Sequence, residues 1–168
     1  ALHDQVSLRG NYDPVDWIEK YIDLMRTPNW HNDTYLEEYH RAFFTRYAQG
    51  KSILKCGISD EHIGGLATVP SLLAALPAGD HRKTTKAHVS LTHRHSNVLR
   101  AADCLVRVLQ FVADGTPLRE AIMTQAGDWF STRKATKWAN QDDRVIIGQR
   151  LSPACYIDQS FPASLYLA

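Results

Sequence analysis

The feature that most constrains this chain is the stretch from Ser96 to Gly115, which reads as one long amphipathic helix. Its apolar side chains recur three and four residues apart, which is the period of an α-helix. No segment of the chain alternates apolar and polar residues with period two over a useful length, as a half-buried strand would. We therefore predict an all-α protein that forms a single domain over residues 1–168. The predicted buried face consists of Val98, Leu99, Ala102, Leu105, Val106, Leu109 and Val112.

Further helices are predicted on both sides of this one. Asp13 can cap a helix that has Pro14 in its first turn and stops near Thr27. Aromatic residues spaced by four predict a second helix that ends at Gly50. The remaining predictions are a buried helix at 69–76, a polar linker at 78–86, a helix at 117–130, an exposed helix at 131–144, weak extended structure at 145–159 and the start of a helix at 160–168.

Composition excludes several classes of function. The 19 Lys and Arg residues balance 18 Asp and Glu residues, so there is no basic field for nucleic acid and no polybasic patch for a membrane surface. No apolar run reaches the roughly 20 residues of a membrane span, and the first ten residues lack the apolar core of a signal peptide. The three cysteines form no CxxC pair, which argues against a zinc knuckle or a disulfide framework. We expect a cytoplasmic protein with reduced thiols.

Two histidines, His93 and His95, stand immediately before the long helix. The helix dipole lowers the pKa of a histidine in this position, so the ring is expected to be neutral and able to bind a carbonyl, a ribose hydroxyl or a phosphate. Together with His88 they have the spacing H-x4-H-x-H, which zinc could also use. The simpler alternative is that His93 is buried and satisfied while His95 is exposed.

A second cluster lies at a predicted junction of a loop and a helix. Ser59, Asp60 and His62 are followed by the pair Gly64 and Gly65. Free backbone N–H groups at such a junction can receive an anion, and glycine lets a ligand approach the main chain. The alternative is an ordinary helix start, with Ser59 as the N-cap and acidic residues in the first turn.

Two weaker groups complete the candidates. Cys56 could pair with His62 as an activated nucleophile, but no third group that would orient the pair is evident. Asn32, Asp33 and Thr34 could help to bind a divalent cation through oxygen atoms, although capping of the following helix explains the same residues.

The two ends of the chain also shape the expectation. The sequence begins "ALHDQVSLRG" without an initiator methionine, and it stops at "FPASLYLA" within an apolar helical pattern. A complete domain seldom ends inside its core, so we expect a segment of a longer protein, incomplete at both ends.

Four stretches in this order resemble the ADP-ribosylglycohydrolase family, which includes the J-type crystallins and the dinitrogenase reductase activating glycohydrolase. They are "YDPVDWIEKYIDLM", "GISDEHIGGLATVPSLLAAL", "VSLTHRHSNVLRAADCLVRVL" and "PACYIDQSFPASLYLA". Each stretch alone is a loose match, but they follow one another in the family's order and span the chain from Tyr12 to Ala168. The resemblance implies an orthogonal multi-helix bundle of that type and, in the complete protein, hydrolysis of ADP-ribosyl bonds with magnesium as cofactor.

The same resemblance assigns binding roles to individual residues. His93 matches the family histidine that touches the ligand, while Ser59 and Asp60 match the loop near the diphosphate or the distal ribose of ADP-ribose. Gly64 and Gly65 match the turn behind that loop. The expected partner is therefore ADP-ribose or an ADP-ribosylated substrate, with neither nucleic acid nor membrane.

The chain departs from the family in its metal motifs. The Ser/Thr-Asp-Asp motif and the Asp-x-Asp-Thr/Ser motif that hold magnesium in the family do not occur in it. The sequence thus assigns no catalytic residue and no metal ligand to this chain. The alternative function is a non-catalytic protein, either structural like a crystallin or a helical binder of a nucleotide-like ligand.

Overall fold

The computed structural model describes residues 1–30, 35–77 and 79–168. Within these ranges it is all-α and has no β-strand, which confirms the predicted fold class at that level. The α-helices are α1 (Leu2–Arg9), α2 (Pro14–Arg26), α3 (Glu38–Ala48), α4 (Val69–Ala75), α5 (His81–Val89), α6 (Ser96–Ala113), α7 (Leu118–Gln125), α8 (Thr132–Trp138), α9 (Asp143–Val145) and α10 (Ile157–Leu167). Three short segments add single turns: the 3₁₀ turns η1 (Ile53–Lys55) and η2 (Ile63–Leu66) and the π-turn η3 (Ile146–Arg150).

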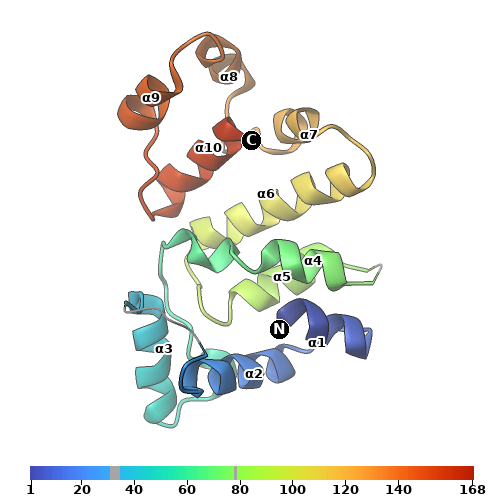
Figure 1. Ribbon diagram of the computed structural model, residues 1–168, viewed down its shortest axis with the longest axis vertical. Helices are drawn as coiled ribbons and strands as arrows, with labels where there is room; N and C mark the ends of the chain where they lie inside the picture. The colour runs from blue at the N-terminus through green and yellow to red at the C-terminus, as the bar shows by residue number, and fades with distance from the viewer. Residues whose placement is uncertain (31–34, 78) are drawn as a thin grey trace.

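The helices are arranged around α6, which crosses the middle of an elongated molecule (Figure 1). Helices α1, α2 and α3 lie below it in this view, and α7 to α10 lie above it. Helices α4 and α5 form the layer between α6 and the N-terminal helices, with α5 packed on α6 and α4 on α1. The loop that follows α5 leads directly into the long helix.

The core divides into three clusters of buried side chains. The largest surrounds α6 and joins it to α4, α7, α8 and α10. A second lies between α2 and α3 and reaches the loops around Cys56 and Leu91, and a third joins α1 to α4 through Leu2, Val6 and Leu72. The long helix contributes Val98, Ala101, Ala102, Cys104, Val106 and Val108 to the first cluster.

The Asp13 cap and two glycine stops predicted from the sequence are confirmed. The Asp13 carboxylate accepts hydrogen bonds from the N–H groups of Val15 (2.7 Å) and Asp16 (3.4 Å), and α2 follows directly. Gly50 has a φ of 78° and Gly115 a φ of 94°, a left-handed conformation that glycine adopts without a steric penalty. The stretch 96–113 is a single helix, as predicted.

The prediction of a polar linker at 78–86 was wrong from residue 81 onward, because α5 spans His81–Val89; Ala78 lies outside the described residues. Asp80 caps this helix by accepting a hydrogen bond from the Lys83 N–H at 2.9 Å. Its buried positions are Thr85, His88 and Val89, two of which are polar residue types. The buried face of α5 is therefore partly polar, and for this reason the sequence shows no apolar pattern there.

Other boundaries also differ from the predictions. Helix α7 ends at Gln125 and not at Phe130. The extended structure predicted at 145–159 was wrong: η3 is a π-turn, and the only strand-like contact of this stretch in the described ranges is an isolated bridge between His62 and Tyr156. Ser96 is the first residue of α6 and not its N-cap, a position that His95 occupies. The capping predicted for Asn32 or Asp33 lies outside the described residues.

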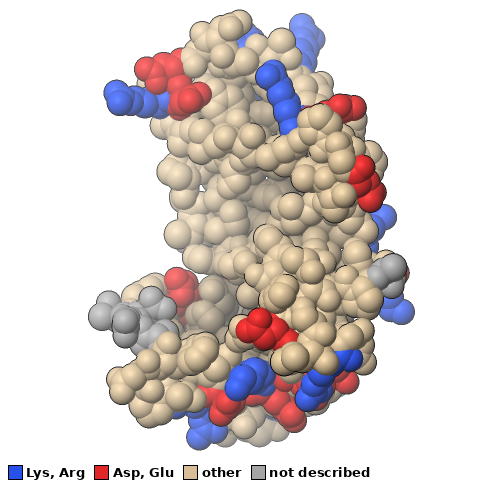
Figure 2. Space-filling view, turned by 45° about the vertical axis from the view of Figure 1, so that its right-hand side comes forward, with Lys and Arg blue, Asp and Glu red and all other residues tan. Residues whose placement is uncertain are grey.

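Charged residues are interspersed on the surface, and both signs gather toward the two ends of the face shown in Figure 2. The middle of that face is mostly uncharged, and its outline is recessed on one side between the upper and lower helices. In the parts of the chain that the structure describes, none of the helices has the length and apolar character needed to cross a bilayer.

Candidate functional site

The two segments singled out in the sequence lie side by side. The Ile58 N–H donates to the Thr92 carbonyl at 3.0 Å, and the Arg94 N–H donates to the Ile58 carbonyl at 2.7 Å. These two bonds form a parallel bridge between Ile58 and His93. Residues 57–60 are thus held against residues 92–94, although more than 30 positions separate them in the sequence.

Gly65 packs closely against the His93 ring. A Cβ atom added to Gly65 would lie 2.8 Å from His93 Cγ, 3.0 Å from His93 Nδ1 and 3.0 Å from Val98 Cγ1. A contact of 2.8 Å is shorter than real Cβ atoms make, so the absence of a side chain at residue 65 is what allows the imidazole to lie here. Gly65 and His93, two residues of the predicted site, are in direct contact.

Helix α3 contributes a third wall through Tyr39. The centroids of the Tyr39 and His93 rings are 4.1 Å apart, with an angle of 50° between the rings. A Cβ atom on Gly64 would lie 2.8 Å from the Tyr39 hydroxyl oxygen and 2.7 Å from His62 Nδ1. In Figure 1 the start of α3, the η2 turn and the start of α10 lie on the same side of the molecule.

The imidazole of His93 is fully buried and only partly hydrogen-bonded. Its Nδ1 atom lies 2.9 Å from the Thr92 hydroxyl oxygen, while Nε2 has no partner among the described residues. Burial lowers the pKa of His93 to about 4, against the opposing effect of the Asp60 carboxylate and with a smaller contribution from His62 and His40. The ring is therefore neutral at pH 7, and one of its nitrogens is left unsatisfied.

Unpaired nitrogens are concentrated at this end of α6. Among the described residues, four buried side-chain atoms lack a hydrogen-bond partner, and two of them are His93 Nε2 and His95 Nδ1. A buried polar group without a partner costs roughly 1–3 kcal/mol, so native proteins tolerate few of them. The position of these two atoms is the strongest indication of a polar ligand in this part of the molecule.

The loop before η2 has a fixed conformation. The Asp60 carboxylate accepts a hydrogen bond from the His62 N–H at 2.7 Å, and His62 Nδ1 accepts one from the Gly64 N–H at 2.9 Å. Ser59 is exposed, Asp60 and Gly64 are half-buried, and His62 caps η2. The predicted N-cap role of Ser59 is wrong, because no helix begins beside it.

The start of α10 closes the same region. The Ile63 N–H donates to the Cys155 carbonyl and the Ile157 N–H donates to the Glu61 carbonyl, both at 2.8 Å. Asn97 of α6 donates to the Asp158 carboxylate at 3.0 and 3.2 Å. These bonds fix the loop around residue 62 between α6 and α10.

The zinc alternative is wrong for the histidines that suggested it. His88 Nδ1 lies 2.8 Å from the Tyr12 hydroxyl and Nε2 lies 2.7 Å from the Thr68 hydroxyl, so both ring nitrogens are engaged. His95 Nε2 lies 3.1 Å from the Glu61 carboxylate. No group of three or more His, Cys, Asp or Glu side chains that could hold a metal ion occurs in the described ranges.

The same finding bears on magnesium. The residues that the structure describes do not form a carboxylate site for a divalent cation, and Asn32, Asp33 and Thr34 lie outside those residues. The described residues therefore do not fit the magnesium that the family resemblance implies.

Cys56 is not an activated nucleophile. Its thiol is buried and donates to the carbonyls of Ser52 (3.4 Å) and Lys51 (3.6 Å). Burial raises the pKa of Cys56, and the nearby cations Lys51, Arg46 and Arg94 only partly oppose it. A thiol with a raised pKa stays protonated at pH 7, which is opposite to what a nucleophile needs.

Sequence reasoning missed Tyr39 as a member of the site. Its position in a stripe with Phe43 and Tyr47 predicts a core residue, and it is indeed buried. Burial raises the pKa of Tyr39 to about 12, with Glu37 and Asp60 adding to the effect, so its hydroxyl stays protonated. The available signal was the hydroxyl itself, since phenylalanine would fill a purely apolar position.

The comparisons with known proteins give no match. No family model matches the chain, and neither the curated proteins nor the solved structures contain a significant neighbour.

Proposed function

We propose that residues 57–65 and 92–95 line a binding site for ADP-ribose, in a protein whose helices follow the arrangement of the ADP-ribosylglycohydrolase family. The observation that carries the proposal is the unpaired Nε2 atom of a buried, neutral His93 beside the Gly64–Gly65 backbone. The complete protein would hydrolyse an ADP-ribosyl bond, and this segment would contribute binding groups.

Each residue of the site would have a distinct role. A neutral imidazole can donate to or accept from a ribose hydroxyl, and such a bond would satisfy His93 Nε2. The two glycines would let the ligand approach the main chain closely. Asp60 and Ser59, which are less buried than His93, would bind polar groups at the outer edge of the site.

Two amide substitutions of His93 separate its two nitrogens. The amide group of glutamine reaches the position of Nε2, whereas that of asparagine reaches only the position of Nδ1. In isothermal titration calorimetry with ADP-ribose, we expect His93→Gln to retain binding and His93→Asn to weaken it about tenfold, corresponding to roughly 1.4 kcal/mol. His3→Gln, at an exposed position of α1, is the matched control and should bind like the wild type.

The titration is repeated with and without magnesium. Binding that depends on His93 Nε2 but not on magnesium supports a binding role of this chain by itself. Equal affinities for His93→Gln and His93→Asn would contradict the proposed role of Nε2.

The second candidate is a non-catalytic structural protein, similar to a crystallin. It is favoured by the complete burial of His93 and by the lack of a cluster of metal ligands in the described part of the chain. In that case the wild-type protein would be folded, as judged by circular dichroism, and would produce no heat with ADP-ribose up to millimolar concentration.

A further inference from the structure

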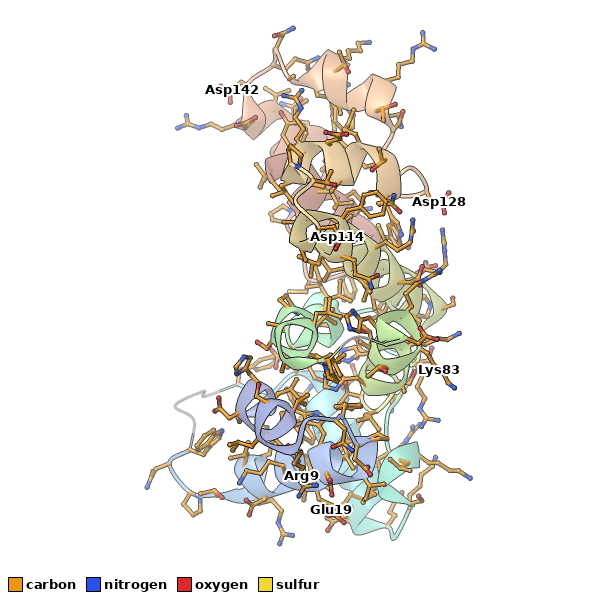
Figure 3. All side chains as sticks on the ribbon, turned by 90° about the vertical axis from the view of Figure 1, so that its right-hand side faces the viewer. Arg9, Glu19, Lys83, Asp114, Asp128 and Asp142 are labelled. Carbon is orange, nitrogen blue, oxygen red and sulfur yellow. The ribbon has the colours of Figure 1, made fainter. Side chains whose placement is uncertain are left out.

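A separate cavity of about 410 Å³ lies against α6, between α5 and the loop that joins α7 to α8. Its charged lining consists of Arg82, Lys86, Arg100, Arg107, Asp103 and Asp128. Figure 3 labels Lys83 of α5 and Asp128 of the loop, which lie on the same side of the molecule and belong to the two elements that border the cavity. None of the residues proposed to bind ADP-ribose lines it.

The Asp103 carboxylate pairs with two of the four cationic side chains. Asp103 binds Arg82 through two hydrogen bonds, of 2.6 and 3.0 Å, and accepts a third from Arg107 at 3.3 Å. Burial acts to raise the pKa of Asp103, but the hydrogen bonds and charges of the two arginines outweigh it, and the pKa is lowered. Asp103 is therefore ionised at pH 7, and one positive charge of this trio remains unbalanced.

The other two cations have no carboxylate partner. Among the described residues, neither Lys86 nor Arg100 forms an ion pair. The Arg100 guanidinium lies over the Trp129 ring, 5.3 Å from its centroid, and donates to the Asn97 side chain at 3.3 Å. Four cationic side chains face two carboxylates, so the lining keeps an excess of two positive charges.

We propose that this cavity binds a phosphate group. Two unpaired cations at the edge of a concave site favour a compact anion of charge −2, because arginine and lysine donate charge-assisted hydrogen bonds to phosphate oxygens. Arg107 is already held by the Gln125 carbonyl at 2.7 Å, so the arginine pair with Asp103 forms a rigid floor. Lys86 and Arg100 are the groups that would close on the anion.

The phosphate could be free or part of an organic phosphomonoester, and two probes distinguish these sources. Inorganic phosphate and phenyl phosphate are each titrated into the full chain at low ionic strength, where charge interactions are weakly screened. Tighter binding of phenyl phosphate would identify an organic phosphomonoester whose ring contacts Trp129. Equal affinities would identify free phosphate.

Variants test the location of the site. We expect Lys86→Gln and Arg100→Gln each to weaken binding of phenyl phosphate about fivefold, the effect of losing one charge-assisted contact. Lys83→Gln is the matched control, because Lys83 is an exposed lysine of the same helix that does not line the cavity. It should bind like the wild type, and circular dichroism should show that all three variants are folded.

Three results would overturn the proposal. The first is that neither probe binds to the wild-type protein. The second is that Lys83→Gln weakens binding as much as Lys86→Gln, which would indicate an unspecific effect of surface charge. The third is that a short single-stranded oligonucleotide binds more tightly than phenyl phosphate and is equally sensitive to all three substitutions.

Discussion

Two buried histidines at the two ends of one short segment provide an instructive comparison. His88, near the end of α5, places its two nitrogens 2.8 Å from the Tyr12 hydroxyl and 2.7 Å from the Thr68 hydroxyl. His93, in the turn before α6, has Thr92 beside one nitrogen and no described partner for the other. Burial lowers the pKa of each to about 4.

The comparison shows that a shifted pKa does not by itself identify a functional histidine. The two rings have the same protonation state at pH 7, because both are removed from water. They differ in whether the surrounding residues complete their hydrogen bonds. His88 links the α1–α2 loop and the N-cap of α4 to α5 and has the properties of a structural residue, whereas His93 retains an unused hydrogen-bonding atom at the predicted site.

The largest expected effect is a loss of folding stability at acidic pH, to which both histidines contribute. Their pKa is lowered from 6.5 in the unfolded chain to about 4 in the folded protein, so the unfolded state binds more protons between these values. Their contribution to stability is complete above pH 6.5 and is lost as the pH falls toward 4. It amounts to about 3 kcal/mol for each ring.

Urea unfolding followed between pH 7.5 and pH 4 measures this loss. Replacing either histidine by leucine should reduce the loss of stability across that interval by about 3 kcal/mol. Unchanged pH dependence in both variants would show that neither ring is buried in its neutral form.

Leucine substitutions at the two positions should differ in cost at pH 7. His88→Leu leaves the hydroxyls of Tyr12 and Thr68 without their partner, and we expect a loss of about 3 kcal/mol in the free energy of unfolding. His93→Leu removes a nitrogen that is already unpaired, so its cost should be about 1 kcal/mol. Equal costs in urea titrations would mean that His93 Nε2 is satisfied in solution without a ligand.

Gly65 allows a smaller test of the packing around His93. In Gly65→Ala the new Cβ would come within 2.8 Å of the ring, so either the imidazole or the η2 turn must shift. We expect a loss of roughly 2 kcal/mol, typical of an overpacked site, together with weaker ADP-ribose binding. Gly127→Ala is the control, because no atom lies within 4 Å of its added Cβ, and its thermal unfolding should match that of the wild type.

Much of the helical framework could be predicted from the sequence, because the signals that set it are local. The Asp13–Pro14 start of α2 and the apolar face of α6 depend only on neighbouring residues. Helix α5 was missed because its inner face includes Thr85 and His88, which the pattern of hydrophobic residues does not count as buried. Hydrogen bonds to distant residues make the burial of His88 tolerable, and such partners are invisible to a local pattern.

The candidate site shows the same limit. The sequence indicated that the glycine pair and His93 could meet, and the structure places Gly65 against His93. Tyr39 could not be predicted as their neighbour, because its position depends on how α3 packs against the η2 turn. The pairing of Ile58 with His93 likewise arises from tertiary packing and not from a strand signal in either segment.

The most direct test of the account is nuclear magnetic resonance of the histidine ring nitrogens during titration with ADP-ribose. We predict that the Nε2 resonance of His93 shifts as its missing hydrogen bond forms, while both nitrogens of His88 keep their positions. A titration in which His93 does not respond, or in which His88 responds equally, would contradict the assignment of the unpaired imidazole as a ligand-binding group.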